Sequence, residues 1–292
     1  MLRGLTITKR MLGAARNLLR KLNRSEGEAT AAQGWTPVFE ESTGRKVSAP
    51  MHRLCAVTDI GKVRRCNEDG YFLSRDCKLW IVADGLGGHA AGQLASKLTI
   101  ETIVGAMEHA GTRSAPVVSH GHSLKEAFAD AQARVLRRSE RDAECQGMGS
   151  TAIAGIVQGE VLHVCHIGDT RCYHFSRGQL RRLTNDHSLV WDLVMAGLLT
   201  PDEARTHPQR GIITQAIGMQ SAVQPDVTSA GLIRGDRVLL CSDGLWEALE
   251  EGVIASIMRS NGSMMDLASM LVDQAKMASG QDNITAVLYE HL

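Results

Sequence analysis

Five aspartates stand at the ends of apolar, strand-like runs of the sequence. Asp84, Asp169 and Asp243 follow such runs at once or after one residue. Asp69 and Asp282 stand just before such runs. An Asp-Gly pair after a single strand is usually only a turn. Five carboxylates repel one another if the strand ends converge, so their recurrence indicates a site that holds cations.

The chemistry of these side chains favours hard divalent ions. All five offer oxygen, and the sequence has no His/Cys spacing of the zinc type, so Mg²⁺ or Mn²⁺ is the expected metal. Two such ions can share a bridging water, lower its pKa toward neutral and direct it at phosphorus. Charge then develops on the phosphoryl oxygens, so a fixed guanidinium is expected nearby. Arg64 is the candidate, and its neighbour Arg65 is interpreted as a solvated turn residue.

A glycine-rich turn follows Asp84. Gly85, Gly87 and Gly88 let the backbone bend tightly and approach a ligand closely. A helical pattern begins directly after this turn. Such an arrangement of strand, acid, turn and helix presents one carboxylate to a metal or to a phosphate, and the turn alone does not decide between them.

The hydrophobic pattern predicts an α+β protein with packed antiparallel sheets. Strand-like runs come in hairpins and helical patterns come in pairs, which does not fit alternating β-α units. A section rich in Pro and Gly, 185–225, is expected to hold short helices. The predicted helices are 90–110, 123–141, 245–259 and 264–278; the predicted strands are 54–57, 71–73, 79–83, 151–157, 161–167, 171–175, 180–183, 237–241 and 284–288.

Composition narrows the class of protein. The 292 residues are 43% apolar, enough for one large domain or two small ones. Lys and Arg total 32, as do Asp and Glu, so no charge bias points to nucleic acid. The seven cysteines read as reduced thiols of a cytosolic protein. No apolar stretch approaches the ~20 residues that span a bilayer.

The first 24 residues form a separate segment. They carry seven basic side chains and no acid, which leaves 25 basic and 32 acidic residues in the rest of the chain. Apolar and basic residues fall on opposite arcs of a helix. Three interpretations stay open: packing on the body or a partner, peripheral binding to an anionic membrane surface, and a targeting segment. Residues 25–50 have the composition of a linker, and the folded domain is expected over 51–292.

Six short motifs together resemble the metal-dependent protein phosphatases of the 2C-like (PPM) family, in its bacterial form. They occur in the family's order and cover roughly residues 52–290. The resemblance implies a two-sheet α-β-β-α sandwich, flanked by helix pairs, with metals in a cleft at one end. The motifs lie at 61–69 (Gly-Lys-Val-Arg-Arg-Cys-Asn-Glu-Asp), 82–89 (Val-Ala-Asp-Gly-Leu-Gly-Gly-His), 149–151 (Gly-Ser-Thr), 168–171 (Gly-Asp-Thr-Arg), 241–244 (Cys-Ser-Asp-Gly) and 280–283 (Gly-Gln-Asp-Asn).

The resemblance also implies the metal ligands. Asp84, Asp243 and Asp282 match direct ligands of two ions, with the Gly85 carbonyl beside them. Asp69 matches an acid that acts mainly through metal-bound water.

Further positions match supporting and substrate-binding parts of the family's site. Glu68 matches a supporting acid, and Arg64 matches the phosphate clamp. Asp169 matches the acid that holds a third, weaker metal with Asp243 in bacterial-type members. Residues 185–225 match the flap that borders the cleft and influences substrate choice.

One position departs from the animal-type pattern. Those members place a His, the proposed general acid, two residues after the metal-binding Asp, and here that residue is Leu86. His89 is the nearest histidine and is a candidate general acid; a metal-bound water is the alternative.

The expected activity is Mg²⁺- or Mn²⁺-dependent hydrolysis of phosphoserine and phosphothreonine in proteins by a metal-bridging hydroxide, opposing a Ser/Thr kinase. We expect a monomer in the bacterial cytoplasm, with peripheral attachment at the inner membrane surface as one role of residues 1–24. Two alternatives stay open. One is a pseudophosphatase that binds phosphoproteins without chemistry, and the other is a membrane or secretion-machinery adaptor that works through residues 1–24.

Overall fold

Strand β2, Leu54–Asp59, shows how the apolar runs of this sequence become sheet. The computed structural model describes residues 45–48, 53–88, 90–112, 120–219 and 222–292. In β2, Leu54 and Ala56 belong to one hydrophobic core, while Cys55 and Val57 belong to a second. Side chains alternate between the two faces of a strand, so this strand is buried on both faces. Its sequence from Leu54 to Val57 is therefore a continuous apolar run and does not alternate between apolar and polar residues.

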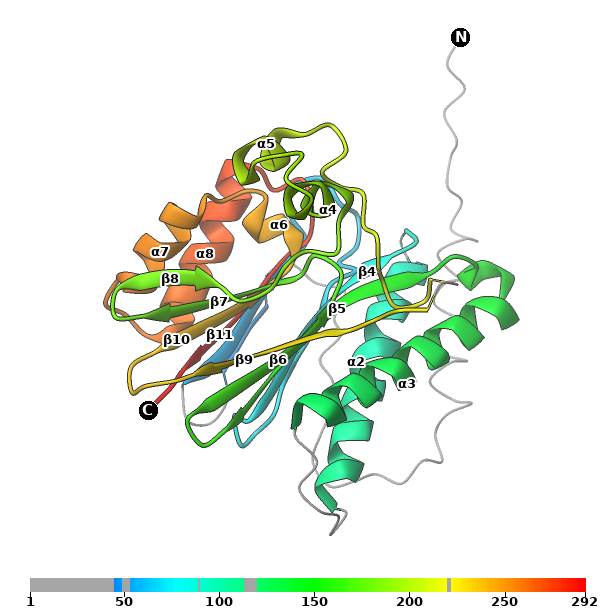
Figure 1. The fold of residues 1–292 in the computed structure, drawn as a ribbon, viewed down its shortest axis with the longest axis horizontal. Coiled ribbons are helices and arrows are strands. Elements are labelled where there is room, and N and C mark those ends of the chain that lie inside the picture. Colours follow the sequence, from blue (N-terminus) through cyan, green and yellow to red (C-terminus); the bar gives the residue numbers. More distant parts are fainter. Residues whose placement is uncertain (1–44, 49–52, 89, 113–119, 220–221) are drawn as a thin grey trace. The chain divides into compact units, whose positions relative to one another are not determined.

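Two antiparallel sheets pack face to face (Figure 1). Every strand pairing in both sheets is antiparallel. The first sheet has the strand order β1 (Arg45–Ser48), β2, β11 (Ile284–Glu290), β10 (Arg237–Cys241), β7 (Arg171–Ser176), β8 (Gln179–Arg182). The second has the order β3 (Gly70–Leu73), β4 (Leu79–Leu86), β5 (Gly149–Gln158), β6 (Val161–Ile167), β9 (Asp226–Gly231).

A helix pair covers the outer face of each sheet. The pair α2 and α3 lies on the second sheet, and α7 and α8 lie on the first (Figure 1). None of the described helices is long and apolar enough to cross a membrane. The helices are α2 (Ala90–Thr112), α3 (His120–Arg141), a 3₁₀ turn (Ala143–Cys145), α4 (Leu189–Met195), α5 (Pro201–Thr206), α6 (Asp243–Trp246), α7 (Glu251–Arg259) and α8 (Met264–Ala278).

The inner core joins the two sheets through large aromatic side chains. The Trp80 ring of β4 stacks on the Tyr289 ring of β11, with centroids 4.6 Å apart and planes 20° apart. A Cβ at Gly155 would lie 3.0 Å from the Trp80 indole, so this position on β5 leaves room for the ring. The stack of Trp80 on Tyr289 fixes one sheet against the other. The two packed sheets and their outer helix pairs confirm the predicted α-β-β-α sandwich.

Three local predictions were wrong. Residues 45–48, expected within the linker, form β1 and pair with β2 from Arg45 opposite Thr58. Residues 226–231 form β9, paired with β6, although no strand was predicted there. Both are edge strands, which are held by backbone hydrogen bonds on one side and need no apolar pattern. The predicted helix 245–259 is two helices, α6 and α7. Residues 1–44, which include the predicted basic helix, lie outside the described residues.

Candidate metal centre

The antiparallel register of the second sheet places two of the predicted acids side by side. Gly70 of β3 pairs with Ala83 of β4. The residue before the first is Asp69, and the residue after the second is Asp84. These two carboxylates therefore leave neighbouring strands at the same end.

The first sheet delivers three more acids in the same way. The end of β10, Cys241, pairs with Arg171 at the start of β7 and with Ala286 near the start of β11. Asp243 follows β10, Asp169 precedes β7, and Asp282 precedes β11. Their three turns therefore emerge at one end of the sheet.

These ends meet in a cleft of about 490 Å³. The cleft brings together seven of the nine residues predicted from the sequence. Asp69 lies buried next to it, and His89 lies outside the described residues, so its role stays a prediction. The seven are Arg64, Glu68, Asp84, Gly85, Asp169, Asp243 and Asp282.

The Asp69 carboxylate is held by two hydroxyl groups. Its Oδ2 accepts hydrogen bonds from the hydroxyls of Ser242 and Thr285, both at 2.7 Å. Burial raises the pKa of Asp69 to about 6, and these hydroxyls and Arg64 oppose the rise. Its other oxygen, Oδ1, is buried and has no hydrogen-bond partner among the described residues. One side of this carboxylate is thus anchored and the other is free to bind a ligand.

Three further acids, Asp84, Asp169 and Asp243, are buried close to other carboxylates. Burial raises the pKa of Asp84 and of Asp243 well above the usual range, and neighbouring carboxylates raise each further. Burial, followed by the nearby Asp186, raises the pKa of Asp169 to about 7. Without a cation, part of this cluster must hold protons near neutral pH.

The donor set fits hard divalent cations. Within the described part of the chain, Oδ1 of Asp69, of Asp169 and of Asp243 are all buried without a hydrogen-bond partner. Buried oxygens are normally satisfied, and a cation would satisfy these and lower the raised pKa values. An all-oxygen cluster favours Mg²⁺ or Mn²⁺.

Close backbone packing explains two glycines beside the acids. A Cβ at Gly85 would lie 2.1 Å from the Gly92 carbonyl oxygen. A Cβ at Gly92 would lie 1.9 Å from Oε2 of Glu68. The first turn of α2 is therefore packed against the turn after β4 and against the Glu68 side chain. Gly85 was predicted from the sequence but Gly92 was not, because a glycine within a helical pattern carries no signal of what approaches it.

Arg64 stands at the exposed edge of the cleft, and its loop is anchored by Asn283. The Asn283 amide accepts from the Glu68 N–H at 2.8 Å. It also donates to the carbonyls of Ile60 and Cys66, both at 3.0 Å. Asn283 directly follows Asp282 in the chain, so these hydrogen bonds hold the 60–68 loop beside Asp282. Asn283 and Ser242 stand within motifs of the sequence but had no predicted role, and Thr285 lies outside all six motifs.

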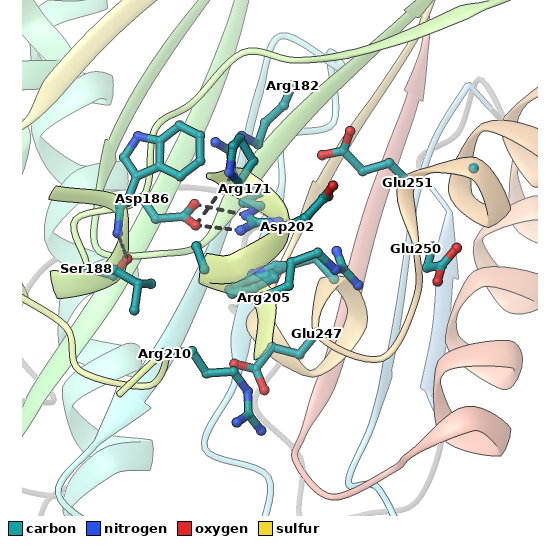
Figure 2. A pocket seen from close by; sticks show the side chains of 16 residues that line it. Arg171, Arg182, Asp186, Ser188, Asp202, Arg205, Arg210, Glu247, Glu250 and Glu251 are labelled. Carbon is teal, nitrogen blue, oxygen red and sulfur yellow. Dashed lines mark hydrogen bonds and ion pairs between the residues drawn. The ribbon is translucent and has the colours of Figure 1, made fainter. Parts of the chain in front are cut away.

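A second cavity of about 560 Å³ adjoins the metal cleft and shares Arg210 and Glu247 with it. Figure 2 shows its charged lining. Asp202 and Arg205 come from α5, while Glu250 and Glu251 come from the start of α7. The 185–225 segment also contributes Pro208, Gly211 and Ile213 to the metal cleft. This segment therefore borders both cavities.

The sequence matches the protein phosphatase 2C family over residues 62–279. The serine/threonine phosphatase Stp of Listeria welshimeri is 32% identical over 236 residues, which are 80% of this chain and 93% of that protein. The crystal structure of the Mycobacterium tuberculosis serine/threonine phosphatase PstP/Ppp is 34% identical with a TM-score of 0.73, covering 82% of this chain and 99% of that one. A PstP catalytic domain in complex with two manganese ions is 32% identical with a TM-score of 0.72, covering 82% and 97%.

Proposed function

The chain belongs to the protein phosphatase 2C family, and on this premise we propose that its cleft hydrolyses phosphoserine and phosphothreonine in proteins. It is a metal-dependent protein-serine/threonine phosphatase of the bacterial type that uses Mn²⁺ or Mg²⁺. The observation that carries this function is the convergence, beside Arg64, of buried aspartate oxygens that have no hydrogen-bond partner among the described residues.

Asp84, Asp243 and Asp282, with the Gly85 carbonyl, would hold two ions. Asp69 would support them through its free oxygen, and Glu68 would fix the loop that carries Asp69 and Arg64. Asp169 would share a third ion with Asp243. When bound, the metals lower the pKa of water and polarise the phosphoryl group.

Arg64 would bind the phosphoryl oxygens. Its guanidinium is exposed at the cleft edge, where a planar fork can take two oxygens of one phosphate. His89 stays our candidate for protonating the leaving serine or threonine oxygen, and its test is His89→Gln with a phosphopeptide and with p-nitrophenyl phosphate. The second substrate has a good leaving group that needs little protonation. A larger loss on the phosphopeptide supports the role, and equal losses refute it.

The 185–225 segment would act as the flap that influences substrate choice. It lines the metal cleft and the adjoining cavity (Figure 2), so a peptide that places its phosphate between the acids must pass it. Arg210 stands at the junction of the two cavities. Replacing Arg210 with Ala should change the relative rates for different phosphopeptides more than the rate for p-nitrophenyl phosphate.

The physiological setting that we propose is the bacterial cytoplasm, where a monomer opposes a Ser/Thr kinase. Residues 1–24 would attach the enzyme to the membrane surface or to a partner protein. Deleting residues 1–40 leaves β1 and all later strands in place and tests this role. Unchanged turnover with lost localisation supports attachment, whereas unchanged localisation refutes it.

The direct test of the chemistry is hydrolysis of p-nitrophenyl phosphate with and without Mn²⁺. We expect turnover that needs the metal and ceases with chelator. Absence of any metal-dependent turnover would favour the pseudophosphatase. The presence of the complete set of metal-binding acids argues against that alternative.

A further inference from the structure

The turn that carries Asp169 is held from both sides by side chains outside the ligand set. Gly168 donates its backbone N–H to Nδ1 of His187 at 3.2 Å. On the other side, Nε1 of Trp246 donates to the carbonyl oxygen of Asp169 at 2.9 Å. This turn between β6 and β7 is therefore clamped at two consecutive residues.

Trp246 also belongs to the element that carries Asp243. Both residues lie on the single-turn helix α6, Asp243–Trp246. The indole reaches from this helix to the Asp169 carbonyl, so one short element joins the two acids that would share the third ion. The pairing of β10 with β7 brings the two turns to one end of the sheet, and this hydrogen bond adds a direct link between them.

The Trp246 ring is itself fixed by a buried ion pair. The Arg171 guanidinium lies over the ring, with its carbon 3.5 Å from the centroid. Arg171 donates to both oxygens of Asp186, at 2.9 and 2.5 Å, as Figure 2 shows. Trp246 is 8% exposed and Arg171 is 6% exposed. Asp186 fixes the edge of the planar guanidinium, and the Trp246 indole packs on its face. The ion pair therefore fixes the orientation of the indole.

His187 is fixed by its second nitrogen. Because Nδ1 accepts the Gly168 N–H, the ring proton must lie on Nε2. Nε2 is 3.3 Å from Oδ2 of Asp226, which is therefore the acceptor. The ring also stacks on His166, with centroids 4.8 Å apart. The contact with Asp226 favours the tautomer that leaves Nδ1 free to accept the Gly168 N–H, and the stack on His166 fixes the orientation of the ring.

We propose that Trp246 and His187 are positioning residues that hold the Asp169 carboxylate where it can share the third, weaker ion with Asp243. The proposal rests on the proposed function, in which Asp169 and Asp243 face that ion. Groups that orient metal ligands change affinity by about 10–100-fold when removed. Loss of the Trp246 N–H or of the His187 acceptor should therefore weaken the third ion by about that factor.

The test is a Mn²⁺ titration by calorimetry, with electron paramagnetic resonance of free Mn²⁺ as a second readout. Trp246→Phe keeps an aromatic face for Arg171 and removes the donor to Asp169, together with part of the buried ring volume. Trp191→Phe is the matched control, because Nε1 of Trp191 is buried without a hydrogen-bond partner among the described residues and its ring lies against Arg182 in the same way, at 3.9 Å.

The expected result is selective loss of weak Mn²⁺ binding. Wild type and Trp191→Phe should show tight ions and one weaker ion. Trp246→Phe should keep the tight ions and bind the weaker one about 10–100-fold less well. Unchanged weak binding in Trp246→Phe, equal weakening in both variants, or no weak ion in the wild type would overturn the proposal.

Two His187 variants decide the matter if Trp246→Phe does not fold. Asn places its carbonyl oxygen near the position of Nδ1 and can accept the Gly168 N–H, while Gln extends toward the Nε2 position. His187→Asn should retain the weak ion and His187→Gln should weaken it. The same affinity in both variants would overturn the role of His187. Failure of the proposed function is separate, since it would appear as a wild type without metal-dependent turnover.

Discussion

Nη2 of Arg64 lies 2.6 Å from Oδ2 of Asp282. Partial burial works against the charge of the guanidinium, but the hydrogen bond and the charge of Asp282 together raise the pKa of Arg64. The group that would bind phosphate is thus paired with an acid that would bind metal. A cation on Asp282 competes with this pair, so metal binding would prepare Arg64 for the phosphate.

Arg64→Ala should lower kcat/KM for a phosphopeptide by about 10–100-fold, the value of one or two charge-assisted hydrogen bonds. Mn²⁺ affinity should not fall, because Arg64 no longer competes with the metal for the Asp282 carboxylate. Arg65→Ala is the control, since Arg65 is exposed and lies outside the residues that line the cleft. Equal losses for both variants would contradict the assignment of Arg64.

Gly244→Ala should destabilise the fold by about 1–3 kcal/mol. A Cβ there would lie 2.1 Å from the Asn283 carbonyl oxygen, and backbone cannot move aside as a side chain would. The control is Gly105→Ala in α2, where a Cβ meets nothing within 4 Å; it should stabilise by about 1 kcal/mol. Urea unfolding measures both, and a Gly244→Ala variant as stable as wild type would refute the packing argument.

Mn²⁺ binding should release protons and strengthen as pH rises. The folded pKa values of Asp69 and Asp169, about 6 and 7, exceed the value of about 3.9 for a free Asp. From about pH 4 to 7, Asp69 and Asp169 therefore bind more protons in the folded metal-free chain than in the unfolded chain, and their stabilising effect is lost as pH rises.

Thermal unfolding from pH 5 to 8, with and without Mn²⁺, checks this sign. Stabilisation by Mn²⁺ should grow with pH, because the metal replaces protons on ionised carboxylates. Calorimetry in buffers of different ionisation enthalpy should detect the released protons. A Mn²⁺ shift in Tm that is constant over this range would contradict the raised pKa values.

The sequence was sufficient for residues whose position follows from local pattern. Asp84 and Asp243 end buried strands and are followed by glycine, and both meet in the cleft as predicted. Arg64 could be placed near them through a motif that also contains Glu68 and Asp69. Trp246 could not be found in this way, because its bond to Asp169 spans 77 residues and nothing local distinguishes it from a core tryptophan.

Edge strands were missed for a related reason. The sequence Asp-Val-Thr-Ser-Ala-Gly of β9 has one large apolar residue and alternates only weakly. Its pairing with β6 comes from backbone groups that any sequence carries. The hydroxyls of Ser242 and Thr285 that bind Asp69 likewise come from two other strand ends, so only the assembled sheets bring them to the carboxylate.

Asp243→Asn tests the metal centre directly. The substitution removes a carboxyl whose ionisation is opposed by burial and by neighbouring carboxylates, so the metal-free variant should melt at a higher temperature than the metal-free wild type. Stabilisation by Mn²⁺ should be largely lost. This pattern separates a metal ligand from a structural residue, whose loss would lower the melting temperature with and without Mn²⁺.

The most direct measurement of the central claim is hydrolysis of a phosphothreonine peptide by the wild type and by Asp243→Asn, each with and without Mn²⁺. The wild type should release phosphate only with the metal. The variant should lose at least about 100-fold in kcat/KM, since even groups behind the ligands cost 10–100-fold. A wild type that releases no phosphate with Mn²⁺, or a variant as active as wild type, would contradict the account.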